Sequence, residues 1–529
     1  MRPAVRRVTV WALPVAFVGF FFVYPLVTIL GRGLWPDGGL DLSPLGDVLA
    51  ADDVRGVFWF TIWQAALSTV LTLIAALPAA YVVTRYRFRG RMVVRALMTV
   101  PFVLPTVVVA SAFRALGFEH SIGAILIAHV FFNYAVVVRT VGGLWAHLDT
   151  RQVDAARMLG ASRLRAFTAV TLWALRPAIL AAASIVFLFS FTSFGVILIL
   201  GGPRRATLET EIFLRYNQLD LRTAAALAVL QLLAVIVLLV VSGRLQGRRA
   251  TALGLTPASE SARPIRSRSD RTVVAGVLAS AAALLGTPLA VLVSRSFDTA
   301  TGFGFGSYDA LTELRRGSVL FVPPIDAIAN SLLYALVATV IALVVGGAAA
   351  FAVARSRRGG LLDTVLALPL GVSAVTLGLG FVIAFDPPID LRTSWVLTPI
   401  AHSLVAIPFV VFIAAPVIRS IDPRLREAAT MLGASPRVVW REVDLPVAAR
   451  GLMVGAGFAF AISLGEFGAT AFIARPDRPT LPVVVFRLLG QPGVENFGAA
   501  MAASTILMVL TLGAVLAIER LRAGELGTF

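Results

Sequence analysis

The chain of 529 residues contains no cysteine and, among its 46 basic residues, no lysine. Without cysteine it has neither disulfide bonds nor thiolate chemistry. A phosphate-binding loop uses a lysine to reach the β- and γ-phosphates, so the chain cannot hydrolyse ATP by that route. Charged residues are also scarce, at 14% of the sequence, whereas soluble domains carry about 25%. These absences exclude a soluble protein and an ATPase of the usual kind.

Histidine is scarce as well, with four in the chain: His120, His129, His147 and His402. None is spaced from another histidine or from a carboxylate in the manner of a metal site. We therefore expect the histidines to lie at helix ends or at the membrane interface, and we expect no metal site. Acids, histidines and cysteines form no cluster of the kind that catalysis requires, so no catalytic residue is predicted.

Apolar sequence is abundant, since 58% of the residues are hydrophobic and the mean hydropathy is +0.87. Spanning a bilayer takes about 20 apolar residues, and runs of this length predict twelve transmembrane helices. The expected spans lie near residues 10–30, 58–84, 92–115, 122–146, 177–200, 222–243, 272–294, 328–354, 361–384, 393–419, 448–473 and 498–520. The first apolar run is too long for a secretory signal and lacks a small-residue cleavage site, so we expect a retained first span.

The chain contains an internal repeat. The sequence Met-Leu-Gly-Ala-Ser starts at Met158 and again at Met431, and this offset of 273 residues also pairs His129 with His402 and Phe194 with Phe467. A period this long is not that of a solenoid, so it indicates a duplicated membrane module. We expect a first half at residues 1–243 and a second half at 272–529. Residues 244–271 form a basic linker whose composition cannot build a core.

The net charge of +17 would suggest nucleic acid for a soluble protein, but here the arginines follow membrane topology. Residues 85–95 carry five arginines and no acid, whereas residues 31–56 carry five aspartates and two arginines. Short arginine-rich loops stay in the cytoplasm. We therefore expect both termini and both copies of the repeated motif on the cytoplasmic face, and no nucleic-acid partner.

Each copy of the motif lies in a polar loop, at about residues 150–176 and 422–447. In the second loop an alanine stripe at helical spacing ends at Gly433, because glycine readily stops a helix. Ser435 is a good N-cap for the helix that follows. The first loop has the same order, with Gly160 and Ser162. One interpretation is an amphipathic connector on the bilayer surface. The recurrence of the acid, the alanines and the glycine in register favours a docking helix.

These residues resemble the cytoplasmic signature of binding-protein-dependent ABC transporter permeases, with Glu427-Ala428-Ala429, Gly433-Ala434 and Leu445-Pro446 in the second loop. The first loop departs from the signature with Asp154 in place of glutamate and Trp173 in place of proline. The resemblance implies an all-α polytopic fold of two six-helix halves. It also implies that the loop helices dock on an ATPase through Asp154, Ala155, Ala156, Gly160, Ala161, Glu427, Ala428, Ala429, Gly433 and Ala434.

The same resemblance implies partners and a location. We expect two copies of an ATPase subunit, which bind ATP and Mg, on the cytoplasmic face of a bacterial inner membrane. We also expect an external solute-binding protein and membrane lipid, and no cofactor bound by the chain itself.

Glu466 falls inside the predicted span 448–473, where an acid normally faces the bundle interior or a water-filled path. Its counterpart in the first half is Ser193. The neighbouring small and aromatic residues predict a translocation path lined by Ser190, Ser193, Phe194, Ser463, Glu466 and Phe467. Glu466 could attract a cationic solute or make a contact between helices. The stretch 465–470 also resembles permeases for anions such as molybdate, which favours the contact.

The solute is suggested only by resemblance. Residues 128–133, 201–209 and 475–481 resemble thiamine permeases, and fused halves are typical of the thiamine and ferric-iron groups. The Leu-Gly-Gly-Pro sequence at 200–203 favours thiamine over iron. A secondary active transporter is an alternative of another class, but it would need several acids deep in its spans. A membrane-embedded enzyme would need a catalytic cluster.

Overall fold

The computed structural model describes residues 3–35, 39, 41–149, 151–202, 204–247, 262–299, 302–315, 318–355, 372–386 and 389–526. Within these ranges the regular structure is helical apart from two pairs of two-residue strands. The strands are β1 (Tyr86–Arg87), which pairs in parallel with β2 (Arg263–Pro264), and β3 (Asp298–Thr299), which pairs antiparallel with β4 (Gly302–Phe303). The predicted all-α polytopic fold is confirmed.

Ten helices in the described ranges are long and apolar enough to cross a membrane. Three of them contain a π-helical turn (η1, η2 or η3) and therefore consist of consecutive segments. The ten are α1–η1–α2 (Pro3–Val18, Gly19–Val23, Tyr24–Leu34), α4 (Asp52–Arg85), α7 (Ile122–Ala146), α9–η2–α10 (Arg163–Ala166, Phe167–Thr171, Leu172–Phe191), α13 (Leu221–Gly247), α15 (Arg268–Arg295), α17 (Asp326–Arg355), α20 (Leu397–Arg419), α22–η3–α23 (Pro436–Val439, Trp440–Asp444, Leu445–Gly465) and α26 (Val494–Leu526). The shorter helices are α3 (Ser43–Ala50), α5 (Arg91–Val103), α6 (Thr106–Ala115), α8 (Arg151–Met158), α11 (Gly195–Leu200), α12 (Leu208–Asn217), α16 (Gly306–Asp309), α19 (Ala374–Ala384), α21 (Pro423–Met431), α24 (Thr470–Ile473) and α25 (Leu481–Leu489).

The long helices coincide with ten of the twelve predicted spans. The span predicted at 92–115 is instead two helices, α5 and α6, bent by 99°. The bend falls at Leu104, which is extended (φ −65°, ψ 141°) because it precedes Pro105 and proline disfavours the helical conformation of the residue before it. The span predicted at 361–384 lies partly outside the described residues, which contain α19 in that region.

Two of the ten spans stop before their predicted ends. α10 ends at Phe191, and the chain resumes as the separate helix α11. α23 ends at Gly465 and resumes as α24. A Cβ atom on Gly465 would lie 3.1 Å from Cγ of Pro105, so this break is also a point of close approach between the halves. Glu466 directly follows the last residue of α23, so it lies at this break and not in the middle of a continuous helix.

The buried core of each half lies where three long helices meet. These are α4, α7 and α10 in the first half and α17, α20 and α23 in the second. Small side chains allow such helices to approach closely. Ala65 on α4 and Ala335 on α17 both have an exposure of 0%.

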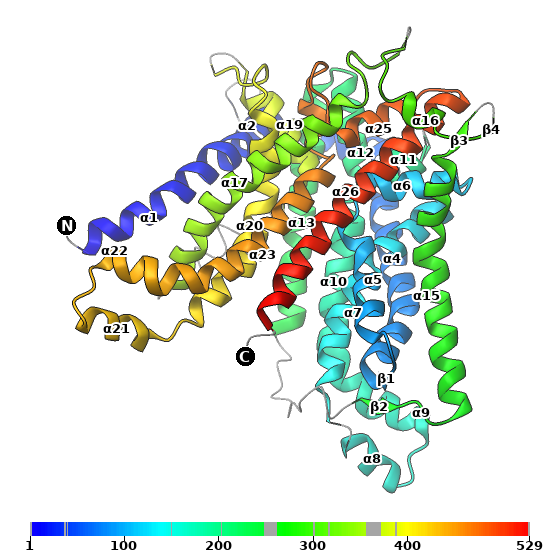
Figure 1. The fold of residues 1–529 in the computed structure, drawn as a ribbon. Helices are drawn as coiled ribbons and strands as arrows, with labels where there is room; N and C mark the ends of the chain where they lie inside the picture. Colours follow the sequence, from blue (N-terminus) through cyan, green and yellow to red (C-terminus); the bar gives the residue numbers. More distant parts are fainter. Residues whose placement is uncertain are drawn as a thin grey trace.

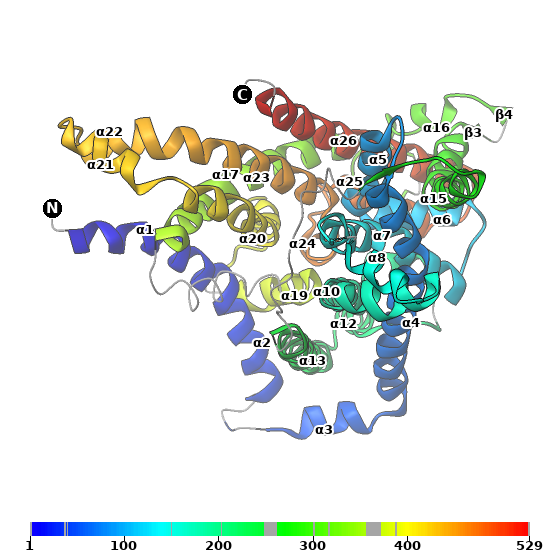
Figure 2. The same ribbon diagram turned by 90° about the horizontal axis from the view of Figure 1, so that it is seen from below.

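The first helix of each half packs against the other half. α1 contacts α17 and α2 contacts α19, whereas α15 contacts α4 and α6 (Figures 1 and 2). The linker end takes part, because Arg263 donates a hydrogen bond of 2.7 Å to the Tyr86 hydroxyl. The two sequence halves are thus tied together by exchanged helices.

The two repeated loops lie apart from each other and away from α12 and α25. Figure 1 shows α12 and α25 close together near the top, whereas α8 lies at the bottom and α21 at the lower left. The helices of the two halves diverge towards the loops. Figure 2 shows the same separation of α8 from α21.

Candidate functional site

Both repeated loops form a helix, a glycine elbow and a second helix, as predicted. Gly160 and Gly433 have φ angles of 88° and 83°, a left-handed conformation that glycine adopts without steric cost. In the first loop Ser162 caps α9 by accepting a hydrogen bond of 3.2 Å from the Arg165 amide. In the second loop the Asp422 carboxylate caps α21 by accepting one of 2.9 Å from the Arg424 amide. We name these two loops the first and second elbows.

The surfaces of the two elbows are exposed in the same pattern. Neither α8 nor α21 contains a buried residue. Met158 and Leu159 at the first elbow, and Met431 and Leu432 at the second, are each 89% exposed. The residues predicted to dock on an ATPase lie beside these apolar tips, exposed (Asp154, Ala155, Gly160, Glu427, Ala428, Gly433) or half-buried (Ala156, Ala161, Ala429, Ala434). Large exposed apolar side chains commonly mark a contact with another protein.

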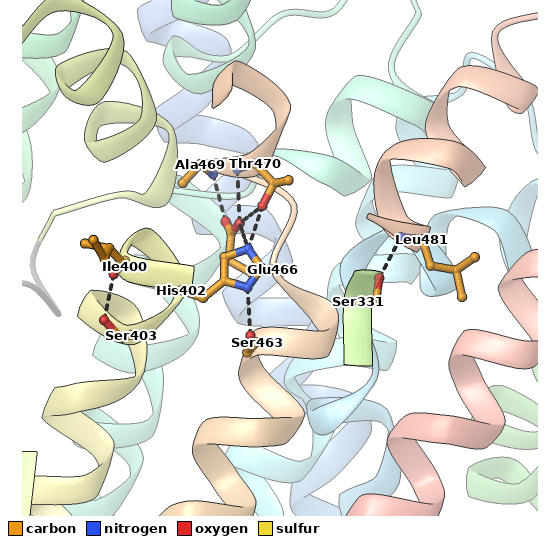
Figure 3. Close-up of polar contacts among 9 residues, drawn as sticks. All are labelled: Ser331, Ile400, His402, Ser403, Ser463, Glu466, Ala469, Thr470 and Leu481. Carbon is orange, nitrogen blue, oxygen red and sulfur yellow. Dashed lines mark hydrogen bonds and ion pairs between the residues drawn. The ribbon is translucent and has the colours of Figure 1, made fainter. Parts of the chain in front are cut away.

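His129 and His402 occupy equivalent buried sites, so the prediction that they lie at helix ends or at the membrane interface is wrong. His129 is 2% exposed; its Nδ1 lies 3.0 Å from Ser68 Oγ and its Nε2 lies 2.9 Å from Ser193 Oγ. His402 is 1% exposed, with Nδ1 at 2.7 Å from Ser463 Oγ and Nε2 at 2.8 Å from Thr470 Oγ1 (Figure 3). Hydroxyl groups on neighbouring segments satisfy both ring nitrogens, which permits the burial.

The Glu466 carboxylate caps the short helix α24. Its Oε1 accepts a hydrogen bond of 2.7 Å from the Ala469 amide, and its Oε2 accepts one of 3.0 Å from the Thr470 amide. Oε2 also accepts a hydrogen bond from the Thr470 hydroxyl and lies 3.3 Å from His402 Nε2 (Figure 3). Burying a carboxylate without partners is costly. Here both oxygens have donors, and the side chain is 3% exposed.

The three serines predicted to line the path are buried and engaged with protein groups. Ser190, Ser193 and Ser463 are 0%, 8% and 3% exposed. The Ser190 carbonyl accepts a hydrogen bond of 2.9 Å from Gln64 Nε2. The Ser193 hydroxyl contacts His129, and the Ser463 hydroxyl contacts His402. In this structure all three serines therefore join neighbouring segments.

Aromatic rings from both halves meet beside these polar groups. Phe194 stacks on Phe467 with centroids 5.4 Å apart and an interplanar angle of 23°. Around this pair, Phe213 lies 5.3 Å from Phe472, and Phe467 lies 5.3 Å from Phe486. We name the aromatic cluster by its six members: Phe194, Phe213 and Tyr216 from the first half, and Phe467, Phe472 and Phe486 from the second. Sequence reasoning selected only Phe194 and Phe467, although the offset of 273 residues also pairs Phe213 with Phe486.

Two further short helices close this end of the bundle. The first amide of α12, Leu208 N, donates to Thr61 Oγ1 over 3.1 Å, and the first amide of α25, Leu481 N, donates to Ser331 Oγ over 2.8 Å (Figure 3). The long helices α4 and α17 thus hold α12 and α25 by equivalent hydroxyl groups.

Glu209 on α12 is a buried acid that sequence reasoning placed only in an outer segment. It is 0% exposed, accepts a hydrogen bond of 3.0 Å from Ser373 Oγ in the other half, and accepts another from Gln231. An acid in the first turn of a helix is common, so the sequence carries no signal that sets Glu209 apart. Its counterpart is Pro482, so the second half cannot make this contact.

Comparison with known proteins gives a consistent result. Residues 68–251 and 329–520 each match the family model described as "Binding-protein-dependent transport system inner membrane component". A probable ABC transporter permease protein, y4fN of Sinorhizobium fredii, is 26% identical over 544 residues, covering 96% of this chain and 94% of that protein. The thiamine transport system permease protein ThiP of Escherichia coli is 28% identical over 494 residues, covering 87% and 88%. The sulfate transport system permease protein CysT of Salmonella typhimurium is 32% identical over 221 residues, covering 38% of this chain and 80% of that protein.

Proposed function

Since the chain belongs to the family of binding-protein-dependent transport system inner membrane components, we propose that it is the permease of an ATP-driven importer whose solute is thiamine. The observation that carries the choice of solute is the aromatic cluster between the halves. Thiamine is an organic cation with two aromatic heterocycles. Aromatic side chains stack on such rings and attract cations, whereas a ferric ion is held by oxygen ligands. The likeness to thiamine permeases supports the same solute.

The elbows are the docking sites for two copies of an ATPase subunit on the cytoplasmic face. Their exposed apolar tips and repeated pattern suit a partner that also comes in two copies. One continuous helical segment leads from each elbow towards the aromatic cluster, Arg163–Phe191 in the first half and Pro436–Gly465 in the second. A shift of an elbow therefore moves the segment that ends directly before the break containing Phe194 or Phe467. The aromatic cluster is the outer gate in its closed state. The separation of the two elbows corresponds to the resting state, before ATP brings the two ATPase subunits together.

Glu466 positions the gate and does not pair with the solute. Its oxygens are occupied by the Ala469 and Thr470 amides, the Thr470 hydroxyl and His402. A solute cation would have to displace these donors in a buried site. The carboxylate instead fixes the break between α23 and α24, next to Phe467.

Proteoliposomes containing the chain, its partner ATPase and the partner binding protein test this function. Radiolabelled thiamine should enter only with ATP and only with all three components, and unlabelled thiamine should compete whereas ferric citrate should not. Uptake of ferric iron in place of thiamine would show that the solute is ferric iron. Uptake by the chain alone, driven by an ion gradient, would reject the importer and favour a secondary transporter.

A further inference from the structure

Asp444 is a buried acid at the base of the second elbow. Its side chain is 2% exposed, and it is the last residue of η3, directly before α23. Arg426 Nε donates a hydrogen bond of 2.6 Å to its Oδ1, and Arg355 Nη2 donates one to its Oδ2. Each carboxylate oxygen thus accepts a hydrogen bond from a different arginine. Hydrogen bonds between ionised partners are the stronger class.

The two arginines come from different elements. Arg426 lies on α21, the helix of the second elbow, and Arg355 is the last residue of the core helix α17. Asp444 itself belongs to the segment α22–η3–α23, which ends beside Glu466. One carboxylate therefore joins the elbow helix, a core helix and the helix that leads to the aromatic cluster.

The first half fastens the equivalent elements without this acid. The offset of 273 residues places Thr171 opposite Asp444 and Val153 opposite Arg426, while Arg85 ends α4 as Arg355 ends α17. α8 packs directly on η2, and Val153 and Thr171 line the same small hollow. Arg85, Asp149 and Gln152 line this hollow as well. The first half thus has a threonine in place of the acid, while the arginine that ends the core helix is kept.

We propose that Asp444 is a positioning residue that transmits movement of the second elbow to α17 and α23. The inference rests on the proposed function as a permease and goes beyond it by assigning the transmission contact. It also makes the two elbows unequal. The second elbow has a buried acid at this position, and the first has Thr171.

Removing one partner of a buried ion pair is more disruptive than replacing the whole set, because the remaining charges lose their counter-ion. Asp444→Thr alone leaves Arg355 and Arg426 facing each other. Asp444→Thr combined with Arg426→Val reproduces the side chains of the first half at these positions. The double variant should therefore work better than the single variant, although it carries one more substitution.

The experiment uses the full complex in proteoliposomes and compares the parent, Asp444→Thr, the double variant and Glu442→Gln. Glu442 is the matched control, since it is an acid on the same helical turn with a side chain that is 64% exposed. We expect Asp444→Thr to lower thiamine uptake per ATP hydrolysed on the order of five- to tenfold, in the range of typical coupling between sites. The double variant should regain at least half of the parent ratio, and Glu442→Gln should match the parent.

A second readout does not depend on the solute. The chain has no cysteine, so spin labels can be placed at Gln218→Cys and Arg478→Cys, two exposed positions on opposite halves at the gate end. ATP should change the distance between them in the parent and in the double variant, but not in Asp444→Thr. An ATP-dependent change of parental size in Asp444→Thr would overturn the inference, as would a double variant no better than the single one.

The two levels of failure remain distinct. If the parent complex hydrolyses ATP and changes the label distance but takes up no thiamine, the solute is wrong and Asp444 is still tested. If the parent shows neither, the proposed function fails. Equal recovery of all variants in complex with the ATPase establishes that they fold and assemble.

Discussion

In the first half His129 bonds to two serine hydroxyls, whereas in the second half the equivalent His402 contacts a serine, a threonine and the Glu466 carboxylate. The same divergence recurs at the elbows, where Asp444 stands opposite Thr171. The glycine elbows and the hydroxyl caps of α12 and α25 are kept in both halves. Both halves thus share the shape of the helices and elbows, whereas at these two sites only the second half has a buried acid.

The difference separates two kinds of constraint on the duplicated halves. Under the proposed function, geometry that meets two copies of an ATPase subunit has to stay equal in both halves. The interior would face a solute without twofold symmetry, so its polar groups would be free to diverge. Glu209 shows the converse case, since this buried acid belongs to the first half and has Pro482 as its counterpart.

The largest effect is expected from substitutions at the glycine elbows, which both halves share. Gly433→Val and Gly160→Val each place a β-branched residue at a left-handed backbone position, which costs about 1–3 kcal/mol of strain. We expect each substitution to abolish co-purification of the ATPase and to reduce uptake more than about tenfold, while the chain still inserts in the membrane. Affinity capture and the uptake assay measure both effects. Normal assembly of either variant would refute the elbow as a docking device.

A smaller effect should separate the two histidine sites. Glu466→Gln keeps the shape but presents an amide NH₂ to groups that donate hydrogen bonds, whereas Ser193→Ala in the first half removes one hydroxyl. We expect the first to lower the maximal uptake rate about two- to fivefold, in line with the loss of one or two hydrogen bonds, with little change in the solute concentration for half-maximal uptake. Ser193→Ala should do less. A large rise in that concentration for Glu466→Gln would show that the acid binds the solute.

The smallest effect concerns the stacked rings. Phe194→Leu and Phe467→Leu each remove one ring of the stacked pair. Such a pair contributes about 0.5–1.5 kcal/mol of interaction free energy beyond the burial of its surface. Both variants should leak thiamine from loaded vesicles without ATP, about twofold faster than the parent. Because the pair straddles the halves, the two leaks should be equal. Leakage confined to one variant would show that the gate is asymmetric.

Local signals in the sequence predicted much of the fold. Apolar runs located the spans, and Gly160 and Gly433 located the elbows, because glycine determines the backbone at its own position. The bend before Pro105 follows a similar local rule, since proline disfavours a helical residue before it. The long apolar run around Pro105 nevertheless led to the prediction of one straight span. The ends of α10 and α23 were misplaced for the same reason, since apolar sequence continues past both breaks.

The polar site was predicted poorly because its partners are distant in the sequence. His402 is 61 residues from Ser463 and 68 residues from Thr470, and no periodicity links them. Glu209 meets Ser373 across 164 residues, and Asp444 meets Arg355 across 89. The repeat offset paired His129 with His402 and Ser193 with Glu466, which indicated equivalent sites without showing what surrounds them.

Cysteine accessibility tests most directly whether both elbows face the cytoplasm and are covered by the ATPase. Met158→Cys and Met431→Cys can each be introduced singly in the cysteine-free chain, at positions that are 89% exposed. A membrane-impermeant maleimide should label neither site in intact cells, both sites in opened membranes, and neither once the ATPase is bound. Labelling of either site from outside intact cells, or failure of the ATPase to protect both, would contradict the account.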